Sequence, residues 1–155
     1  MKETGEPIKR NEFLKPLSRD HHHGLLLCWK IRTGFSKGIP SHRIKSYADW
    51  FYKNHLLPHF EIEEKYVFPV LGSENKYIRQ AIEEHRRLIS LFSDTSNIED
   101  SLKQIQTELE KHIRFEERIL FNEIQNAATK EQLEKILQVQ TEVKFEENTD
   151  DEFWL

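Results

Sequence analysis

The sequence predicts an all-α protein: an antiparallel up-down-up-down four-helix bundle with a short additional C-terminal helix and an acidic tail. Three observations predict this fold. Four segments repeat apolar residues every three or four positions, which is the spacing of one helix face. The chain has only 5 Gly and 5 Pro, few for a β protein built on tight turns. Its 155 residues, 37% of them hydrophobic, suit a single core.

The first predicted helix spans residues 11–35 and ends in a turn over residues 34–40, where glycines and a proline gather. The second predicted helix spans residues 41–71, with Ser41 as its cap. Pro58 should kink this helix or divide it in two, because proline removes a backbone hydrogen bond. We favour a kinked continuous helix, since the apolar pattern resumes without a loop-like gap.

The third predicted helix follows Gly72 and Ser73, and the fourth spans residues 98–127. Short joins between four long helices favour antiparallel neighbours. A shorter fifth helix should follow Thr129. We therefore divide the chain into a bundle, residues 11–127, and a C-terminal helix with an acidic tail, residues 128–155.

The net charge of -4 is concentrated at one end of the chain. Residues 141–155 carry six acidic residues and one lysine, a net of -5, so the remainder is near +1. No nucleic-acid surface is indicated. No apolar run is long enough to cross a membrane. The first residues lack a signal-peptide pattern, and the single cysteine, Cys28, fits a reducing compartment, so we predict a cytoplasmic protein.

Two segments on different predicted helices share one chemical pattern, a histidine followed after three residues by two glutamates, with a phenylalanine four residues later. The two copies are His59-x-x-x-Glu63-Glu64 and His112-x-x-x-Glu116-Glu117. Residues four apart lie on the same helix face, so each copy directs one imidazole and one carboxylate inward with its apolar neighbours. The second glutamate of each copy points about 100° away, which favours a supporting or ion-paired role.

Buried carboxylates need a cationic partner, and no lysine or arginine shares these inward stripes. A metal cluster would satisfy that need, because imidazoles suit iron and carboxylates can bridge two ions. His21 and His85 lie on the inward stripes of the first and third helices. The predicted metal ligands are His21, His59, Glu63, His85, His112 and Glu116.

Three nearby residues leave alternatives open. His22 is the second choice for the first-helix ligand, because consecutive helical residues cannot all face the core. His55 lies one turn before His59 and is either an extra ligand, a supporting donor or a partly exposed polar residue. Cys28 lies on the core stripe and is interpreted as a small buried hydrophobe.

These residues resemble the hemerythrin-like family, the HHE cation-binding domain, from about Leu17 to Phe121. The resemblance rests on the two repeated segments together with Asp20-His21 and Glu84-His85. It implies a four-helix bundle around two iron ions with an oxo or hydroxo bridge. The choice of iron over manganese or zinc rests on this resemblance, since the ligand types alone accept several metals.

Two departures separate this chain from the oxygen carriers of that family. Ile89 stands where those carriers have a further third-helix histidine, and Glu116 replaces an aspartate one position later. The resemblance therefore predicts one imidazole fewer and favours other functions over oxygen transport.

We favour a non-enzymatic di-iron protein that senses or binds oxygen, nitric oxide or iron, with no catalytic residue. A small diatomic ligand and an unidentified protein partner are the expected partners. The alternative is a di-iron redox enzyme, an oxidase or peroxide-reducing protein in oxidative or nitrosative stress defence. Ferritin-like enzymes pair Glu-x-x-His on two helices, a spacing that no histidine here has. A metal-free structural bundle would leave the inward glutamates unexplained.

The acidic tail, with Phe153 and Trp154, could pack on the bundle, meet a partner or be disordered.

Overall fold

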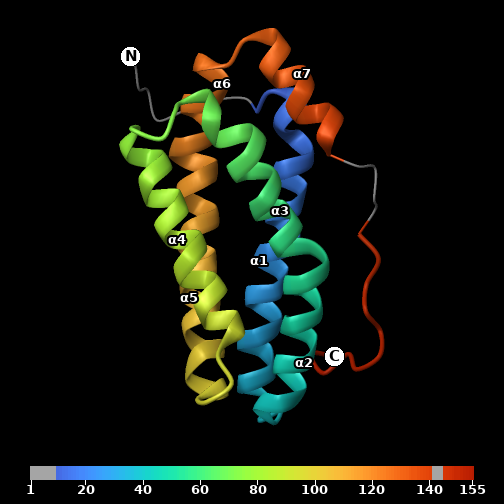
Figure 1. The fold of residues 1–155 in the computed structure, drawn as a ribbon. Helices are drawn as coiled ribbons and strands as arrows, with labels where there is room; N and C mark the ends of the chain where they lie inside the picture. The colour runs from blue at the N-terminus through green and yellow to red at the C-terminus, as the bar shows by residue number, and fades with distance from the viewer. Residues whose placement is uncertain (1–9, 141–144) are drawn as a thin grey trace.

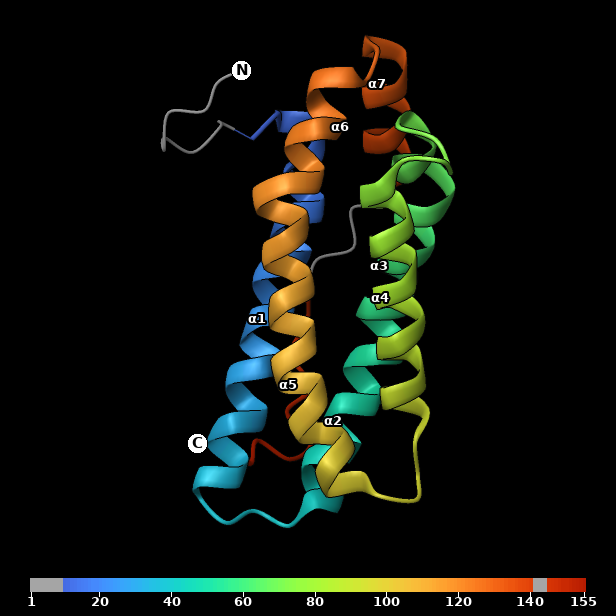
Figure 2. The same cartoon turned by 90° about the vertical axis from the view of Figure 1, so that its left-hand side faces the viewer.

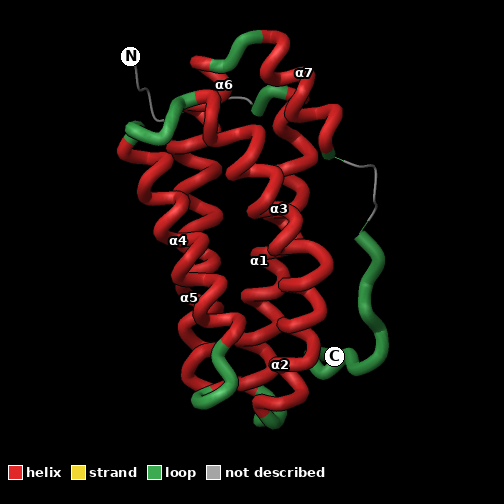
Figure 3. Tube along the Cα trace, in the orientation of Figure 1, coloured by secondary structure: helices red, strands yellow, loops and turns green. Residues whose placement is uncertain are grey.

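The computed structural model describes residues 10–140 and 145–155, and every regular element in these ranges is helical (Figure 3). The predicted all-α class is therefore confirmed. Residues 1–9, part of the stretch predicted to lack a signal peptide, and residues 141–144 of the predicted acidic tail lie outside the described residues.

The first helical run consists of a 3₁₀ turn, Glu12–Leu14, and helix α1, Lys15–Ser36. It ends at Gly38, whose φ of 73° is accessible to glycine at little cost. The Ile39 amide donates to the Gly34 carbonyl, and the Gly38 amide to that of Phe35, which together close the helix. The predicted turn began too early, because Gly34 still belongs to the helix.

The second helical run continues without interruption from residue 41 to residue 70. Its parts are α2 (Ser41–Phe51), a π turn (Tyr52–Leu56), α3 (Leu57–Ile62), a second π turn (Glu63–Val67) and a 3₁₀ turn (Phe68–Val70). The backbone stays helical through Pro58, and the first π turn comes just before it. The predicted cap was wrong: Ser41 is the first helical residue, and Pro40 holds the cap position without a side-chain hydrogen bond.

The C-terminal half contains four further helices and a third π turn. These are α4 (Lys76–Ser93), α5 (Ile98–Phe115), the π turn Glu116–Leu120, α6 (Phe121–Ala127) and α7 (Lys130–Val139). Three of these four helices begin where polar side chains accept from first-turn amides: Asn75 caps α4, Asn97 caps α5 and Thr129 forms a capping box with Gln132 on α7. Among the described helices, none has the length and apolar character needed to cross a membrane.

The long helices lie side by side along one axis, as two perpendicular views show (Figures 1 and 2). Helix α5 contacts α1, α2 and α4, and α1 also contacts α2. Helix α7 lies at one end of the molecule and packs against the 3₁₀ turn that precedes α1.

The apolar core is divided into two clusters, one toward each end of the helices. One contains Leu27, Leu88 and Leu109, and the other contains Leu17 and Leu120. Along α1, α4 and α5 with its following π turn, the buried histidines and glutamates fall between members of the two clusters. A buried polar layer therefore crosses the molecule between two apolar regions.

The C-terminal residues 145–155 return along the outside of the helices and end beside α1 and α2 (Figures 1 and 2). Phe153 and Trp154 are buried and join the apolar cluster that contains Tyr47. Arg43 holds Asp151 through two hydrogen bonds of 2.8 and 2.7 Å. Of the three alternatives for the tail, packing on the body is the one found in its described part.

Candidate metal centre

The buried polar layer brings together six side chains from all four long helical runs. They are His21 on α1, His59 on α3, Glu63 at the start of the second π turn, His85 on α4, His112 on α5 and Glu116 at the start of the third π turn. None of the six is more than 5% exposed. The predicted residues thus lie together, and both central carboxylates are completely inaccessible to solvent.

The ligand atoms form two overlapping groups that share both glutamates. One group is His21, His59, Glu63 and Glu116, and the other is Glu63, His85, His112 and Glu116. Within each group the candidate atoms all lie within 4.8 Å of one another. The two oxygens of Glu63 face different groups, since Oε2 lies 3.1 Å from His59 Nε2 and Oε1 lies 3.0 Å from His85 Nε2. This is the arrangement in which a carboxylate could bridge two ions.

Several of these atoms are close without being hydrogen-bonded. Both oxygens of Glu63, Oε2 of Glu116, and Nε2 of His85 and of His112 have no hydrogen-bond partner among the described residues. No lysine or arginine in the described part of the chain forms an ion pair with Glu63 or Glu116. Leaving buried polar atoms unpaired is costly, so the cluster fits a bound cation.

The other nitrogen of each imidazole is held by a carboxylate from an adjacent helical run. These Nδ1–oxygen pairs are His21–Glu117 at 2.6 Å, His59–Asp20 at 3.0 Å, His85–Glu64 at 2.6 Å and His112–Glu84 at 2.7 Å. An ionised carboxylate only accepts, so Nδ1 donates the proton. In the neutral imidazole this leaves the Nε2 lone pair facing the cluster, as metal ligation requires.

The carboxylates around the cluster follow a repeated pattern. Glu64 and Glu117, the second glutamates of the two segments, hold the imidazoles of the third and first helical runs. Asp20 and Glu84 were not predicted as part of the site. The sequence contains a signal for them, because an acidic residue directly precedes both His21 and His85, but the partner of each lies on another helix.

Both central glutamates open a π turn. The Phe68 amide donates to the Glu63 carbonyl, and the Phe121 amide donates to the Glu116 carbonyl, each five residues apart. The phenylalanine that ends each segment stacks on an imidazole: Phe68 on His85 at 5.4 Å and Phe121 on His21 at 5.1 Å. The shared sequence pattern therefore repeats as shared backbone geometry. Turns of this type are frequent at functional sites.

Burial alone would lower the pKa of His59, but the charge of Glu63 and the hydrogen bond to Asp20 outweigh it and raise the pKa to about 9. The pKa of His85 rises to about 11 against the same effect of burial, because the carboxylates of Glu116 and Glu63 lie close to its Nε2. Burial raises the pKa values of both central glutamates, and the adjacent imidazoles lower them by more. Without metal, protons supply the positive charge that the cluster needs.

The alternatives left open on the first two helices differ in burial. His21 is buried and contacts the cluster, whereas His22 is exposed. His55 makes no contact with the central glutamates and lines a cavity beside His59.

Cys28 is buried in the apolar core, where burial raises the pKa of its thiol to about 12. Ile89 is partly buried and packs against the same apolar cluster.

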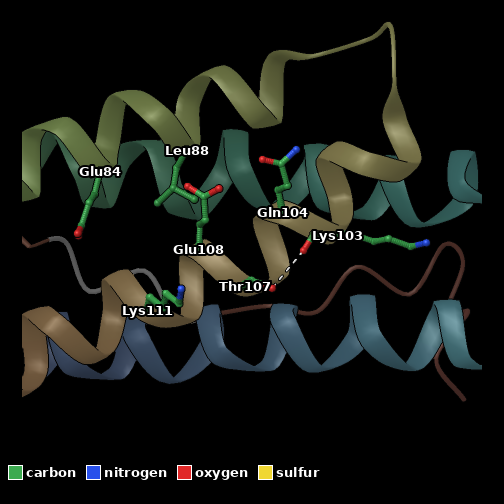
Figure 4. Close-up of a pocket in the computed structure, with 7 residues that line it drawn as sticks. All are labelled: Glu84, Leu88, Lys103, Gln104, Thr107, Glu108 and Lys111. Carbon is green, nitrogen blue, oxygen red and sulfur yellow. Dashed lines mark hydrogen bonds between the residues drawn. The ribbon is translucent and has the colours of Figure 1, made fainter.

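A wider groove of about 500 Å³ lies between α4 and α5 (Figure 4). Its lining includes the exposed Lys103 and the partly buried Glu108, and Glu84 reaches it from α4. Glu84 therefore connects the groove to His112, but the groove contains none of the six clustered side chains.

Residues 71–145 match the hemerythrin HHE cation-binding domain family. The C-terminal half of the chain therefore resembles that family. The matched range contains His85, His112 and Glu116, and the remaining three clustered residues precede it. No curated protein and no solved structure matches the chain. Geometry alone places the three clustered residues outside the matched range beside the other three.

Proposed function

We propose that this chain binds two iron ions through His21, His59, Glu63, His85, His112 and Glu116. The observation that carries the proposal is the buried carboxylate pair. Three of its four oxygens lie against imidazoles without hydrogen bonds, and the fourth, Oε1 of Glu116, lies 2.8 Å from His21 Nε2. Glu63 and Glu116 would bridge the ions, with His21 and His59 on one ion and His85 and His112 on the other. The match to a cation-binding domain supports a metal, and we infer iron with an oxo or hydroxo bridge from the resemblance to hemerythrin, since these ligand types accept several metals.

We further propose that the binding unit is an antiparallel up-down-up-down four-helix bundle over residues 11–127, followed by a C-terminal helix and tail over residues 128–155. The contacts of α5 with α1, α2 and α4 support this arrangement. A cytoplasmic location is part of the same proposal.

Each proposed ion would have two imidazoles and two shared carboxylates, which leaves coordination positions for a small ligand. We therefore propose that the protein senses or binds oxygen, nitric oxide or iron. The chain's own groups would orient the imidazoles through carboxylates and exclude water from the two central glutamates, which have no solvent exposure.

The same open positions favour one alternative, a di-iron redox enzyme acting on oxygen or peroxide. Bound iron would supply the electrons for such chemistry. One experiment distinguishes the two functions. The ferrous protein is mixed with hydrogen peroxide, and the amount of peroxide consumed per chain is measured. A stoichiometric reaction supports binding or sensing, whereas repeated consumption of peroxide with an added reductant supports an enzyme.

Metal binding itself is tested by purifying the protein in air and measuring iron, manganese and zinc per chain together with the near-ultraviolet spectrum. Two iron ions per chain and an absorption band from the bridged iron pair are expected. Iron content that is low and equal in the wild type, His59→Ala and His112→Ala would refute the proposal.

A further inference from the structure

A small cavity adjoins the cluster on the side of His21 and His59. Its volume is about 30 Å³, and the polar residues Asp20, His23 and His55 are in its lining. A cavity of this size holds one or two water molecules or a ligand of a few atoms. The cavity is therefore of a size to hold a small molecule next to the proposed metal ligands.

One wall of this cavity comes from the far end of the chain. Phe145 lines the cavity, and its ring stacks on His23 with centroids 4.1 Å apart and planes 12° apart. The same ring lies 4.8 Å from His55 and contacts Phe51. Nδ1 of His23 is buried and has no hydrogen-bond partner among the described residues, so a polar group in the cavity would find one there.

The segment that carries Phe145 is fastened by a buried charge. Glu147 accepts from Lys30 Nζ at 2.5 Å and from the Tyr47 hydroxyl at 2.5 Å. Lys30 is only 6% exposed, and its ammonium lies 4.1 Å from the centre of the Trp154 ring. Releasing the segment would leave this lysine without its carboxylate, which is unfavourable for a buried charge.

We propose that residues 145–155 form a cover over this cavity and that Phe145 determines which external ligands reach the metal centre. The inference rests on the proposed function, because it concerns access to the proposed iron ions. Compact ligands of two or three atoms fit the closed cavity but must pass Phe145 to enter it, and larger ones require the cover to move. The Lys30–Tyr47–Glu147 contact is the fastening that keeps it closed.

The test compares Phe145→Ala with Phe35→Ala, a partly buried phenylalanine that packs against the core and does not line the cavity. Each protein is loaded with iron, its metal content is measured, and the binding of azide and of imidazole is followed by absorption. In Phe145→Ala, azide should bind about tenfold faster or more, equivalent to a barrier lowered by about 1.4 kcal/mol. Imidazole should bind only to this variant.

The outcomes separate the two proposals. Wild-type protein that takes up less than about one iron per chain refutes the metal centre, and the inference fails with it. If wild type, Phe145→Ala and Phe35→Ala each hold two iron ions per chain and bind azide at equal rates, the cover is refuted and the metal centre is not.

The fastening is tested without metal. In the metal-free protein, Glu147→Gln should let a non-specific protease remove the C-terminal segment faster than in wild type, and Asp150→Asn should not. Equal cleavage of the Glu147→Gln and wild-type proteins would overturn the fastening role of Glu147.

Discussion

At the residue scale, the site depends on a ring of carboxylates as much as on the six central side chains. Each imidazole is oriented by an acidic residue on a different helical run. The central residues could be predicted, because the two matched segments put a histidine and a glutamate on one helix face. The orienting role of Asp20 and Glu84 could not be predicted, because the imidazole that each one holds is set by how neighbouring helices pack.

Replacing one of these orienting carboxylates should weaken metal binding while leaving all six central residues in place. Glu84→Gln should lower metal affinity about 10- to 100-fold, because the amide no longer holds the His112 ring as a charged acceptor. Competition with a chromophoric chelator measures this. Glu83→Gln, the exposed neighbour on the same helix, is the matched control, and an equal loss in both variants would contradict the orienting role.

The raised pKa values predict a pH dependence for the metal-free protein. A group whose pKa is raised on folding stabilises the fold below its ordinary pKa and loses that contribution as pH rises through the folded value. For His59 the window runs from about 6.5 to about 9. The melting temperature of metal-free protein should therefore fall over this range. His59→Gln should show a smaller fall, and the exposed His42→Gln should behave as wild type.

At the element scale, the sequence predicted where helices begin and end better than it predicted the backbone geometry inside them. The fourth predicted helix spans the same residues, 98–127, as the helical run observed. The three π turns were not predicted, because the apolar spacing of a helix hardly changes when one turn takes an extra residue. Two of these π turns begin at Glu63 and Glu116, so the repeated segments share backbone geometry as well as ligand types.

Close packing around α1 predicts opposite outcomes for two helical glycines. A Cβ at Gly34 would lie 2.8 Å from both Ile44 and Phe153, and so between two side chains. At Gly24 it would lie 2.7 Å from Ile113 Cδ1, the end of one flexible side chain that can shift. Alanine favours a helix by about 1 kcal/mol over glycine, and overpacking costs about 1–3 kcal/mol. Gly34→Ala should therefore unfold at lower denaturant than wild type, and Gly24→Ala should be near neutral or stabilising. Equal stability of the two variants would contradict this packing.

At the scale of the whole molecule, the proposed metal centre joins all four long helical runs at the boundary between two apolar clusters. The sequence could not decide among the alternatives for the C-terminal segment. Its position depends on distant contacts, of which Lys30 with Glu147 and Arg43 with Asp151 are examples.

Because the cluster connects every long helix, metal binding should stabilise the whole fold. At a free metal concentration about 100 times the dissociation constant, the gain is about 2.7 kcal/mol. For a chain of this length, that corresponds to a melting temperature higher by roughly 5–10 °C. Calorimetry with and without iron measures the shift. The shift should shrink in His112→Ala, and an undiminished shift would place the stabilising metal elsewhere.

The most direct test of the central claim is the metal content per chain of the wild type and of Glu63→Gln, with Glu61→Gln as the exposed control. The two groups of ligand atoms predict about two iron ions per chain in the wild type and in the control. Because Glu63 faces both groups, its replacement should reduce occupancy of both ions. A wild type with less than about one metal ion per chain, or a Glu63→Gln variant that retains two, would contradict the account.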